Sequence, residues 1–470
     1  MSNEPNEFEN VELYDQFYEC KPAYWDVNNS TSVLSDLIVE LFNNSKNNKD
    51  QHCMMNEEII NNKESLENYI IISLLENSTL HLPKQYDEVV YLGSGQQGVL
   101  CAARDRLTGK MVAIKKFDHP FKQSDDVESF LREFRILQFV NHPNVMNLLD
   151  AFPGDAQSLD QFEDVYLVTE LMDHDLSIIC NDRQHCLSHS EIAEIIFQIL
   201  VGVQYLHRIG LVHGDLSPAN IVVRRNRFAG HLELKIIDFS QTKSCRSWTN
   251  VNHQSLLSTR SYRAPEVILN MDNHFDYPID VWSIGCIMAE LLSKDVLFRG
   301  ISDLHQWKHI ESILGNPRDT FLRRIRSSVR NILGRQRTMN YRRNLEQIFN
   351  TKFDSNDDNK HYNEQAMDLL RQILVVDPRE RITIDDALKH PYLNARNVNT
   401  LQNGDEQRNE QINNFEHTII EYREQSNDCI DIQLSEDERH HRWKKLLFDE
   451  IRLFQHKHRQ QIRQTLNTII

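Results

Sequence analysis

The spacing of apolar residues predicts strands in the first half of the chain and helices in the second. Short apolar runs broken by glycine, a pattern typical of antiparallel strands, occupy 86–93, 100–104 and 111–117. Residues 127–140 carry apolar side chains at helical spacing, after capping-type residues at 124 and 125. Residues 165–171 read as a buried strand. These elements predict a strand-rich lobe that contains one helix.

Helical patterns dominate after this strand. Ser188 and Glu191 form a capping-box pattern that opens a helix running to about His207 and stopping at Gly210. Two short strands are expected at 221–223 and 232–237, and a long apolar helix at 278–292. The fold class predicted from this order is α+β, with a small antiparallel-sheet lobe followed by a larger, mostly helical lobe.

The two ends of the chain differ in composition from the centre. Residues 1–80 form an acidic, Asn-rich extension, in which the apolar spacing predicts helices at 33–42 and 57–75. Residues 394–434 are polar and read as a linker. Residues 435–470 are expected to form a helical extension whose apolar face is made by Trp443, Leu446, Leu447 and Ile451.

Charge and composition exclude several classes of protein. The 470 residues carry a formal net charge of −17, of which the 15 acidic and 4 basic side chains of residues 1–80 contribute −11, so general nucleic-acid binding is not expected. No apolar run approaches the roughly 18 residues that a membrane helix needs. The polar, acidic start is unlike a leader peptide, and eight cysteines without C-x-x-C spacing suit a reducing compartment. We expect a cytoplasmic monomer, with the nucleus left open as a second location.

Two features of the first lobe indicate a phosphate ligand. A glycine-rich stretch, Gly93-Ser94-Gly95-Gln96-Gln97-Gly98, links two predicted strands, where glycines let backbone N–H groups approach phosphates, although such a stretch alone is also typical of a plain turn. Lys115 ends an apolar strand, and Glu133 lies on the following helix. They are either a pair that serves a ligand or two surface charges.

Three polar motifs follow in the second lobe, beginning at His213, Asp238 and Ala264. Asp215 is expected in a loop, where its carboxylate could accept a proton from a hydroxyl nucleophile. Asn220 and Asp238 offer hard oxygen ligands that suit Mg²⁺. All these motifs in this order are hard to explain by chance.

The series of motifs resembles the protein-kinase signature set. Longer segments resemble MAP kinases, most closely the Jun N-terminal type, at 148–152, 165–173, 262–269 and 280–288. The resemblance covers residues 86–393, with a small lobe over about 86–172 and a large lobe over about 173–393. It also includes a C-terminal helix that this family returns to its small lobe.

The resemblance implies a two-lobed kinase that binds ATP and Mg²⁺ between its lobes and acts on protein substrates, under upstream kinases or scaffolds. Asp215 is then the catalytic base, Lys115, paired with Glu133, binds the α and β phosphates, and Asn220 and Asp238 bind metal. Thr169 is the gatekeeper, and Glu266 pairs with Arg381. The implied nucleotide-binding residues are Leu92, Gly93, Ser94, Gly95, Gln96, Gln97, Gly98, Val99, Leu100, Ala113, Lys115, Thr169, Glu170 and Met172.

Several positions depart from the family pattern. Gly214 and Ser217 replace an arginine and a lysine of the catalytic loop, and Ser240 replaces a glycine after Asp238. The T-x-Y phosphorylation motif falls on Gln254-Ser255-Leu256. Arg132, Arg260 and Arg263 nevertheless remain to read a phosphate, and Ser255, Ser258 or Thr249 could still be modified. The acidic docking patch becomes residues 394–399, without carboxylates, so basic docking peptides should bind weakly.

Two function hypotheses follow. The first is a MAP-kinase-like serine/threonine kinase, proline-directed by resemblance, with reduced activity and atypical activation. The alternative is a pseudokinase that binds nucleotide and serves as a scaffold in a stress pathway. Arginines between 323 and 343 could indicate nucleic acid, and residues 439–442 a metal site, but in both places a solvated face is the better interpretation.

Overall fold

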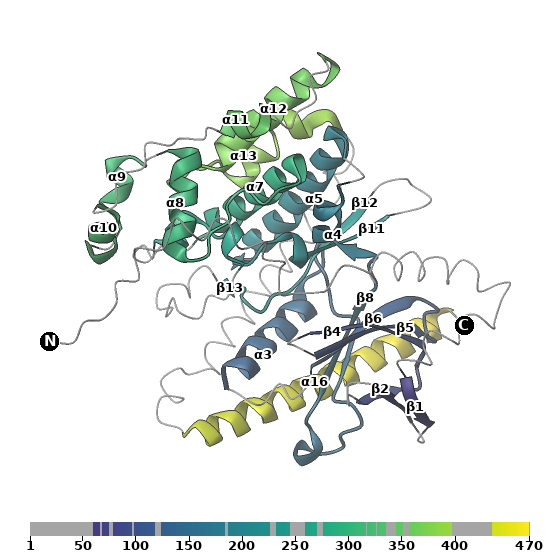
Figure 1. Ribbon diagram of the computed structural model, residues 1–470. Coiled ribbons are helices and arrows are strands. Elements are labelled where there is room, and N and C mark those ends of the chain that lie inside the picture. Colours follow the sequence, from purple (N-terminus) through teal and green to yellow (C-terminus); the bar gives the residue numbers. More distant parts are fainter. Residues whose placement is uncertain are drawn as a thin grey trace. The chain divides into compact units, whose positions relative to one another are not determined.

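The structure is a computed structural model (Figure 1). It describes residues 60–65, 68–74, 79–95, 98–117, 124–183, 187–225, 232–244, 259–269, 276–315, 317–325, 327–334, 345–350, 357–396 and 435–469. The expected helix at 33–42, most of the linker at 394–434 and the T-x-Y position lie outside these ranges.

A five-stranded antiparallel sheet forms the core of the small lobe. Its strands, in spatial order, are β4 (Tyr86–Gly95), β5 (Gly98–Asp105), β6 (Met111–Phe117), β8 (Val165–Glu170) and β7 (Asp150–Phe152). The strands expected from the sequence at 86–93, 100–104, 111–117 and 165–171 are therefore confirmed. Helix α3 (Ser124–Phe139) is also confirmed, and Phe130, Leu131 and Phe134 on it are buried.

The helix expected at 57–75 is wrong. This stretch instead forms β1 (Ile60–Ser65) and β2 (Tyr69–Leu74), which pair with β3 (Thr79–Pro83) in a three-stranded antiparallel sheet. The run Ile70-Ile71-Ile72 explains the outcome, because β-branched side chains fit the pleated surface of a sheet better than a helix. Lys116 of β6 donates to the Thr79 carbonyl oxygen (2.9 Å), and the Tyr166 hydroxyl accepts from the His81 N–H (2.9 Å).

The large lobe is organised around two buried helices, α5 (His189–Arg208) and α7 (Pro278–Ser293). The capping box of α5 is present, with the Ser188 hydroxyl accepting from the Glu191 N–H and the Glu191 side chain accepting from the Ser188 N–H. Strands β11 (Ile221–Arg225) and β12 (Leu232–Ile236) form the expected hairpin, and β9 (His174–Asp175) pairs with β11.

Eight further described helices complete this lobe. They are α4 (Leu176–Asn181), α6 (Pro265–Ile268), α8 (Asp303–Leu314), α9 (Asp319–Leu322), α10 (Ser327–Gly334), α11 (Leu345–Asn350), α12 (Asp357–Ile373) and α13 (Ile384–Ala387). Two-residue strands β10 (Leu211–Val212) and β13 (Lys243–Ser244) pair near the site, and 3₁₀ turns occupy Leu159–Gln161 (η2), Pro218–Asn220 (η3), Arg260–Tyr262 (η6) and Pro391–Arg396 (η7). Among the described residues, no helix is both long and apolar enough to cross a bilayer.

The C-terminal extension is one helix, α16 (Glu436–Ile469), which packs along α3 and contacts β7 and η2 (Figure 1). Leu447 and Ile451 are buried in the small-lobe core, and Trp443 and Leu446 pack against it, as the sequence predicted. Arg135 of α3 donates its Nε to both carboxylate oxygens of Glu450 (3.0 and 2.9 Å). The chain therefore returns to its small lobe through both apolar packing and an ion pair.

Removing apolar contact from α16 should destabilise the protein. We expect Leu447→Ala, at a fully buried side chain, to lower the free energy of unfolding by about 2–5 kcal/mol. Leu453→Ala is the matched control on the same helix, because Leu453 is 53% exposed and its loss should change stability by no more than about 0.5 kcal/mol. Chemical denaturation of the variants measures both, and equal effects would show that α16 does not pack as described.

Candidate active site

The glycine-rich stretch joins β4 and β5 in a tight hairpin. The register pairs Ser94 with Val99 and Gly95 with Gly98, and Gln96 and Gln97 lie outside the described residues. Gly98 has φ +124°, a conformation that side-chain-bearing residues rarely adopt, so glycine is required there. Gly93 and Val99 are buried, Leu92 is partly buried and Leu100 is exposed. The hairpin can place backbone N–H groups over a phosphate.

Strand β6 presents Lys115 beside this hairpin. Its register pairs Lys115 with Leu100 on one side and Leu167 on the other, and pairs Ala113 with Thr169, so these residues share one face of the sheet. The Lys115 Nζ lies 4.4 Å from the centroid of the Phe117 ring. The face combines a cation with small and apolar side chains, which suits a nucleotide.

Glu133 is the buried carboxylate on α3 that faces this lysine. Burial raises the pKa of Glu133 to about 7, the charge of Lys115 opposes that rise, and the charge of Asp238 adds to it. The three groups are therefore close enough to interact electrostatically. This excludes the alternative in which Lys115 and Glu133 are two independent surface charges.

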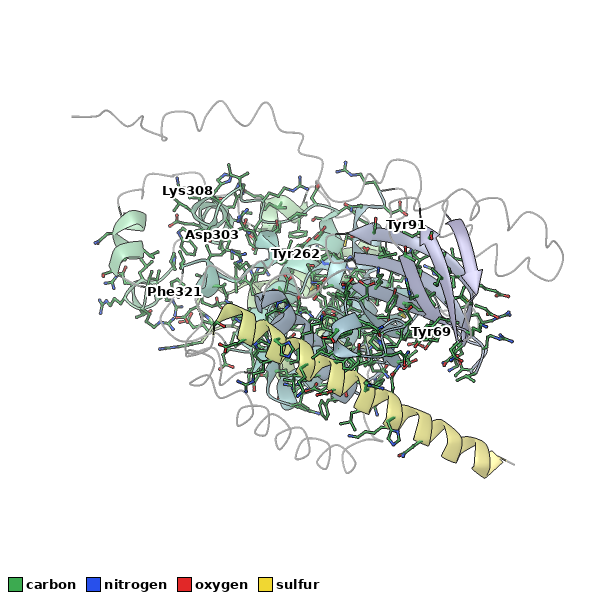
Figure 2. The ribbon with its side chains drawn as sticks, turned by 90° about the horizontal axis from the view of Figure 1, so that it is seen from below. Tyr69, Tyr91, Tyr262, Asp303, Lys308 and Phe321 are labelled. Carbon is green, nitrogen blue, oxygen red and sulfur yellow. The ribbon has the colours of Figure 1, made fainter. Side chains whose placement is uncertain are left out.

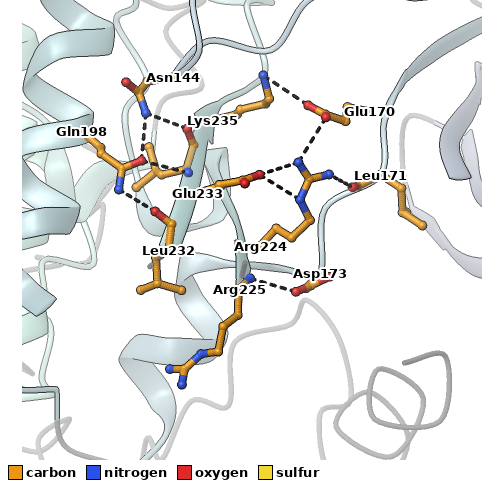
Figure 3. Close-up of polar contacts among 11 residues, drawn as sticks. Asn144, Glu170, Leu171, Asp173, Gln198, Arg224, Arg225, Leu232, Glu233 and Lys235 are labelled. Atoms are coloured by element: carbon orange, nitrogen blue, oxygen red, sulfur yellow. Dashed lines mark hydrogen bonds and ion pairs between the residues drawn. The ribbon is translucent and has the colours of Figure 1, made fainter. Parts of the chain in front are cut away.

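A polar network fixes the segment that links the two lobes (Figure 3). Arg224 of β11 donates to the Leu171 carbonyl oxygen (3.3 Å) and to Glu170 (3.2 Å), and it also pairs with Glu233 of β12. Lys235 pairs with Glu170 as well (3.2 Å). Residues 170–173, which include Met172, are thereby held against the β11–β12 hairpin, and the backbone proposed to meet adenine has a defined position.

Asp280 of α7 holds the backbone of the catalytic loop. Its carboxylate is fully buried and accepts hydrogen bonds from the N–H groups of His213 and Gly214 (both 2.9 Å) and from His207 Nε2 (2.8 Å). Burial alone would raise the pKa of Asp280, but the hydrogen bond and charge of His207, aided by His213 and the Gly214 N–H, hold this pKa below its ordinary value. Gly214 has φ +78°, so the residue that replaces the family arginine relieves backbone strain.

Asp215 follows this anchor directly. Its Oδ1 accepts from the Thr259 N–H (2.9 Å), and its backbone carbonyl accepts from Asn220 Nδ2 (2.8 Å). Burial raises the pKa of Asp215 to about 7; the Thr259 hydrogen bond and the charge of Arg263 lower it, and the charge of Asp238 raises it. A carboxylate with a pKa near neutrality is suited to general base catalysis.

Asn220 and Asp238 fit a role in binding Mg²⁺. The amide nitrogen of Asn220 donates to Asp215, which leaves its oxygen as the atom for a metal, and Asp238 interacts electrostatically with both Asp215 and Glu133. Within the described residues, no group of three His, Cys, Asp or Glu side chains could hold a metal unaided. A hard cation here would need phosphate and water oxygens to complete its coordination, as is usual for Mg²⁺.

The segment after Asp238 has one defined conformation. Asp238 has φ +64°, and Phe239 is fully buried in the small-lobe core, with its ring 5.6 Å from that of His213. Arg132 of α3 donates to the Ser240 carbonyl oxygen (3.0 Å), and the Ser240 N–H donates to Asp238 Oδ1 (3.1 Å). Ser240 is thus accommodated with Phe239 packed inward.

Ser217, the replacement for the family lysine, is 2% exposed, and its Oγ has no hydrogen-bond partner among the described residues.

Glu266 and Arg381 form the expected bidentate pair (2.8 and 2.9 Å), which is buried, with the Arg381 guanidinium over the Trp282 ring. Of the arginines from 323 onward, Arg323 and Arg330 are exposed, as expected for a solvated face, whereas Arg324 is partly buried and pairs with Asp377.

Sequence reasoning missed two residues that shape the site, Asp280 and Arg224. Asp280 stood inside a motif that resembled the family, but nothing nearby in the sequence predicted its bonds to a loop 66 positions away. A carboxylate at the start of a mostly apolar helix was the available signal, because a buried charge needs partners.

The geometry is that of a protein kinase, and comparison with known sequences agrees. The model of the protein kinase domain matches residues 86–393, so the chain belongs to the protein kinase family. The chain is 37% identical over 356 residues to a stress-activated protein kinase JNK of Drosophila melanogaster, covering 74% of this chain and 91% of that protein. It is 38% identical over 335 residues to the stress-activated protein kinase jnk-1 of Caenorhabditis elegans, covering 70% and 68%. The resemblance to MAP kinases of this type is confirmed.

Removing the charge of Asp280 should loosen the catalytic loop. We expect Asp280→Asn to lower the free energy of unfolding by about 1.5–3 kcal/mol at neutral pH, because buried donors lose a charged acceptor. A lowered pKa in the folded protein means that this stabilisation is present above the ordinary aspartate pKa of 3.8 and is lost as the pH falls through the lower folded value. Denaturation of wild type and variant at a series of pH values measures the difference, with Asp319→Asn, at an exposed position, as the control. A difference that does not shrink in acid would contradict this account.

Proposed function

We propose that this chain is an ATP- and Mg²⁺-dependent serine/threonine kinase of the MAP kinase type that phosphorylates proteins at Ser-Pro or Thr-Pro sites. The observation that carries the proposal is the convergence on Asp215 of the Thr259 N–H, Asn220 and the charge of Asp238. The named relatives favour a role in stress signalling, with upstream kinases or scaffolds as partners. We propose a monomer in the cytoplasm, with the nucleus as a second location.

This geometry and the family resemblance together support the following roles for the residues. ATP supplies the phosphoryl group, and Mg²⁺ neutralises phosphate charge. The hydroxyl oxygen of the substrate would form a bond to the γ-phosphorus of ATP, and the bond between that phosphorus and the β–γ bridging oxygen would break. Asp215 would accept the proton of the hydroxyl group. Lys115, held by Glu133, would bind the α and β phosphates, and Asn220 and Asp238 would hold the metal. The backbone at Glu170 and Met172 would bind adenine, with Thr169 behind it.

The changed catalytic loop supports a slow enzyme. Removing one preorganised donor that faces developing charge costs about 10²–10³ in rate in comparable sites. Ser217 cannot supply the positive charge of a lysine, and Gly214 cannot supply that of an arginine. The same two residues favour the second candidate function, a pseudokinase that binds nucleotide and acts as a scaffold.

Phosphate transfer distinguishes the two candidates. We expect purified full-length protein to phosphorylate a Ser-Pro or Thr-Pro peptide in the presence of Mg-ATP, and Asp215→Asn to reduce the rate by about 10²-fold or more, since the general base is lost. Thermal stabilisation by Mg-ATP should be retained in the variant. Equal transfer rates from both proteins, with stabilisation intact, would favour the scaffold.

A cation at position 217 should accelerate transfer. We expect Ser217→Lys to raise kcat by about tenfold or more, because a lysine there would face the charge that develops on the phosphoryl group. Ser217→Met is the control, since it adds similar length without charge. An unchanged kcat in the lysine variant would show that another group of the chain already supplies the positive charge.

A further inference from the structure

The segment just before α6 is tied to the first turn of α8 by two arginines and one carboxylate. Arg260 Nε and Arg263 Nη1 both donate to Oδ1 of Asp303, at 3.3 and 3.1 Å. The Arg263 side chain is only 12% exposed, so its charge needs a nearby anion. Figure 2 labels Asp303 and Tyr262, which belong to the two segments that this contact joins.

Further hydrogen bonds make this contact continuous along the segment. Arg260 Nη1 donates to the Ile301 carbonyl oxygen (3.1 Å), and the buried Gln306 donates its Nε2 to the Ser261 carbonyl oxygen (3.4 Å). The Gln306 Oε1 accepts from the Gly300 N–H (2.6 Å), which fixes the loop before α8. Residues 260–263 are therefore held in place by hydrogen bonds to the start of α8 and the loop before it.

The other side of the same segment meets the catalytic base. The Thr259 N–H donates to Asp215 Oδ1 (2.9 Å), and the Tyr262 carbonyl oxygen accepts from the Ser283 hydroxyl of α7 (2.8 Å). Thr259 is adjacent to Arg260 in the chain. The ion pairs that hold Arg260 and Arg263 consequently also hold the Thr259 N–H that donates to Asp215.

The anion in this arrangement belongs to the chain itself. The family's two phosphate acceptors fall on Gln254 and Leu256, neither of which can carry a phosphate ester. The arginines that the resemblance assigns to reading a phosphate nevertheless remain, and two of them bind Asp303. A carboxylate at the first position of a helix is also favoured by the helix dipole.

We propose that Asp303 is a built-in substitute for an activating phosphate: it anchors Arg260 and Arg263, and through Thr259 it positions Asp215 in the unphosphorylated protein. Asp303 is thus a positioning residue that acts through its neighbours and does not touch substrate. The inference rests on the proposed kinase function for its consequence, but the anchoring itself is a property of the folded chain.

The test compares full-length protein, freed of phosphate by a phosphatase and checked by intact mass, with Asp303→Asn. Hydrogen–deuterium exchange of the amides at 259–263 should be about 3- to 10-fold faster in the variant, because the two ion pairs that hold this segment are lost. Peptide phosphorylation should show a similar fall in kcat, with KM for Mg-ATP unchanged, because the nucleotide site is not touched. Asp303→Glu, which keeps the charge, should restore both values.

Glu380→Gln is the control, since it removes a similarly exposed carboxylate, paired with Arg318 elsewhere in the large lobe, and should change neither measurement. The proposal is overturned if the amides of Asp303→Asn exchange like those of the parent, or if phosphorylating the parent slows their exchange and raises kcat more than tenfold. The exchange measurement decides the anchoring even if Asp215→Asn shows that the chain transfers no phosphate.

Discussion

The site depends on one buried charge, the carboxylate of Asp280. An ion without water is costly to bury, and this one is stabilised by two backbone N–H groups and a histidine that come from different elements. Because the two backbone donors belong to the consecutive residues His213 and Gly214, stabilising the charge also fixes the path of the chain into Asp215. The position of Asp215, the proposed base, thus follows from the need to stabilise this buried charge inside the large lobe.

Local sequence patterns predicted most of the helices and strands, because most of these elements are specified by the residue pattern within a short segment. Strands at 86–117 and the capping box at Ser188 follow from short-range alternation and side-chain-to-backbone bonding. The prediction for residues 57–75 was wrong because their apolar spacing suits a helix or a strand. Pairing with β3, which lies outside this stretch, favours the strand. Motif order made Asp215 and its companions candidates, whereas the contacts of Arg224 with Leu171 and of Asp303 with Arg260 span more than 40 positions and leave no local signal.

The departures from the family pattern are easier to understand together than singly. A glycine at 214 removes a cation but suits a left-handed backbone, and the lost phosphate acceptors coincide with a carboxylate beside the remaining arginines. If Asp303 acts as proposed, a charge that is always present takes the place of one that other enzymes add and remove. The family's lysine at position 217 is lost. Among the described residues, no group hydrogen-bonds to the Ser217 Oγ that stands in its place.

The sheet formed by β1–β3 affects how the catalytic domain can be isolated. The family match begins at Tyr86, but β3 ends at Pro83, and Lys116 and Tyr166 of the small lobe bond to its backbone. A shortened protein that begins at Tyr86 would lack Leu80 and Leu82, which are buried in one apolar cluster with Tyr86 and Phe152, and would leave Lys116 without its carbonyl partner. The folded unit therefore begins upstream of Tyr86, where the family match begins. A recombinant protein made to study the kinase domain should begin before β1.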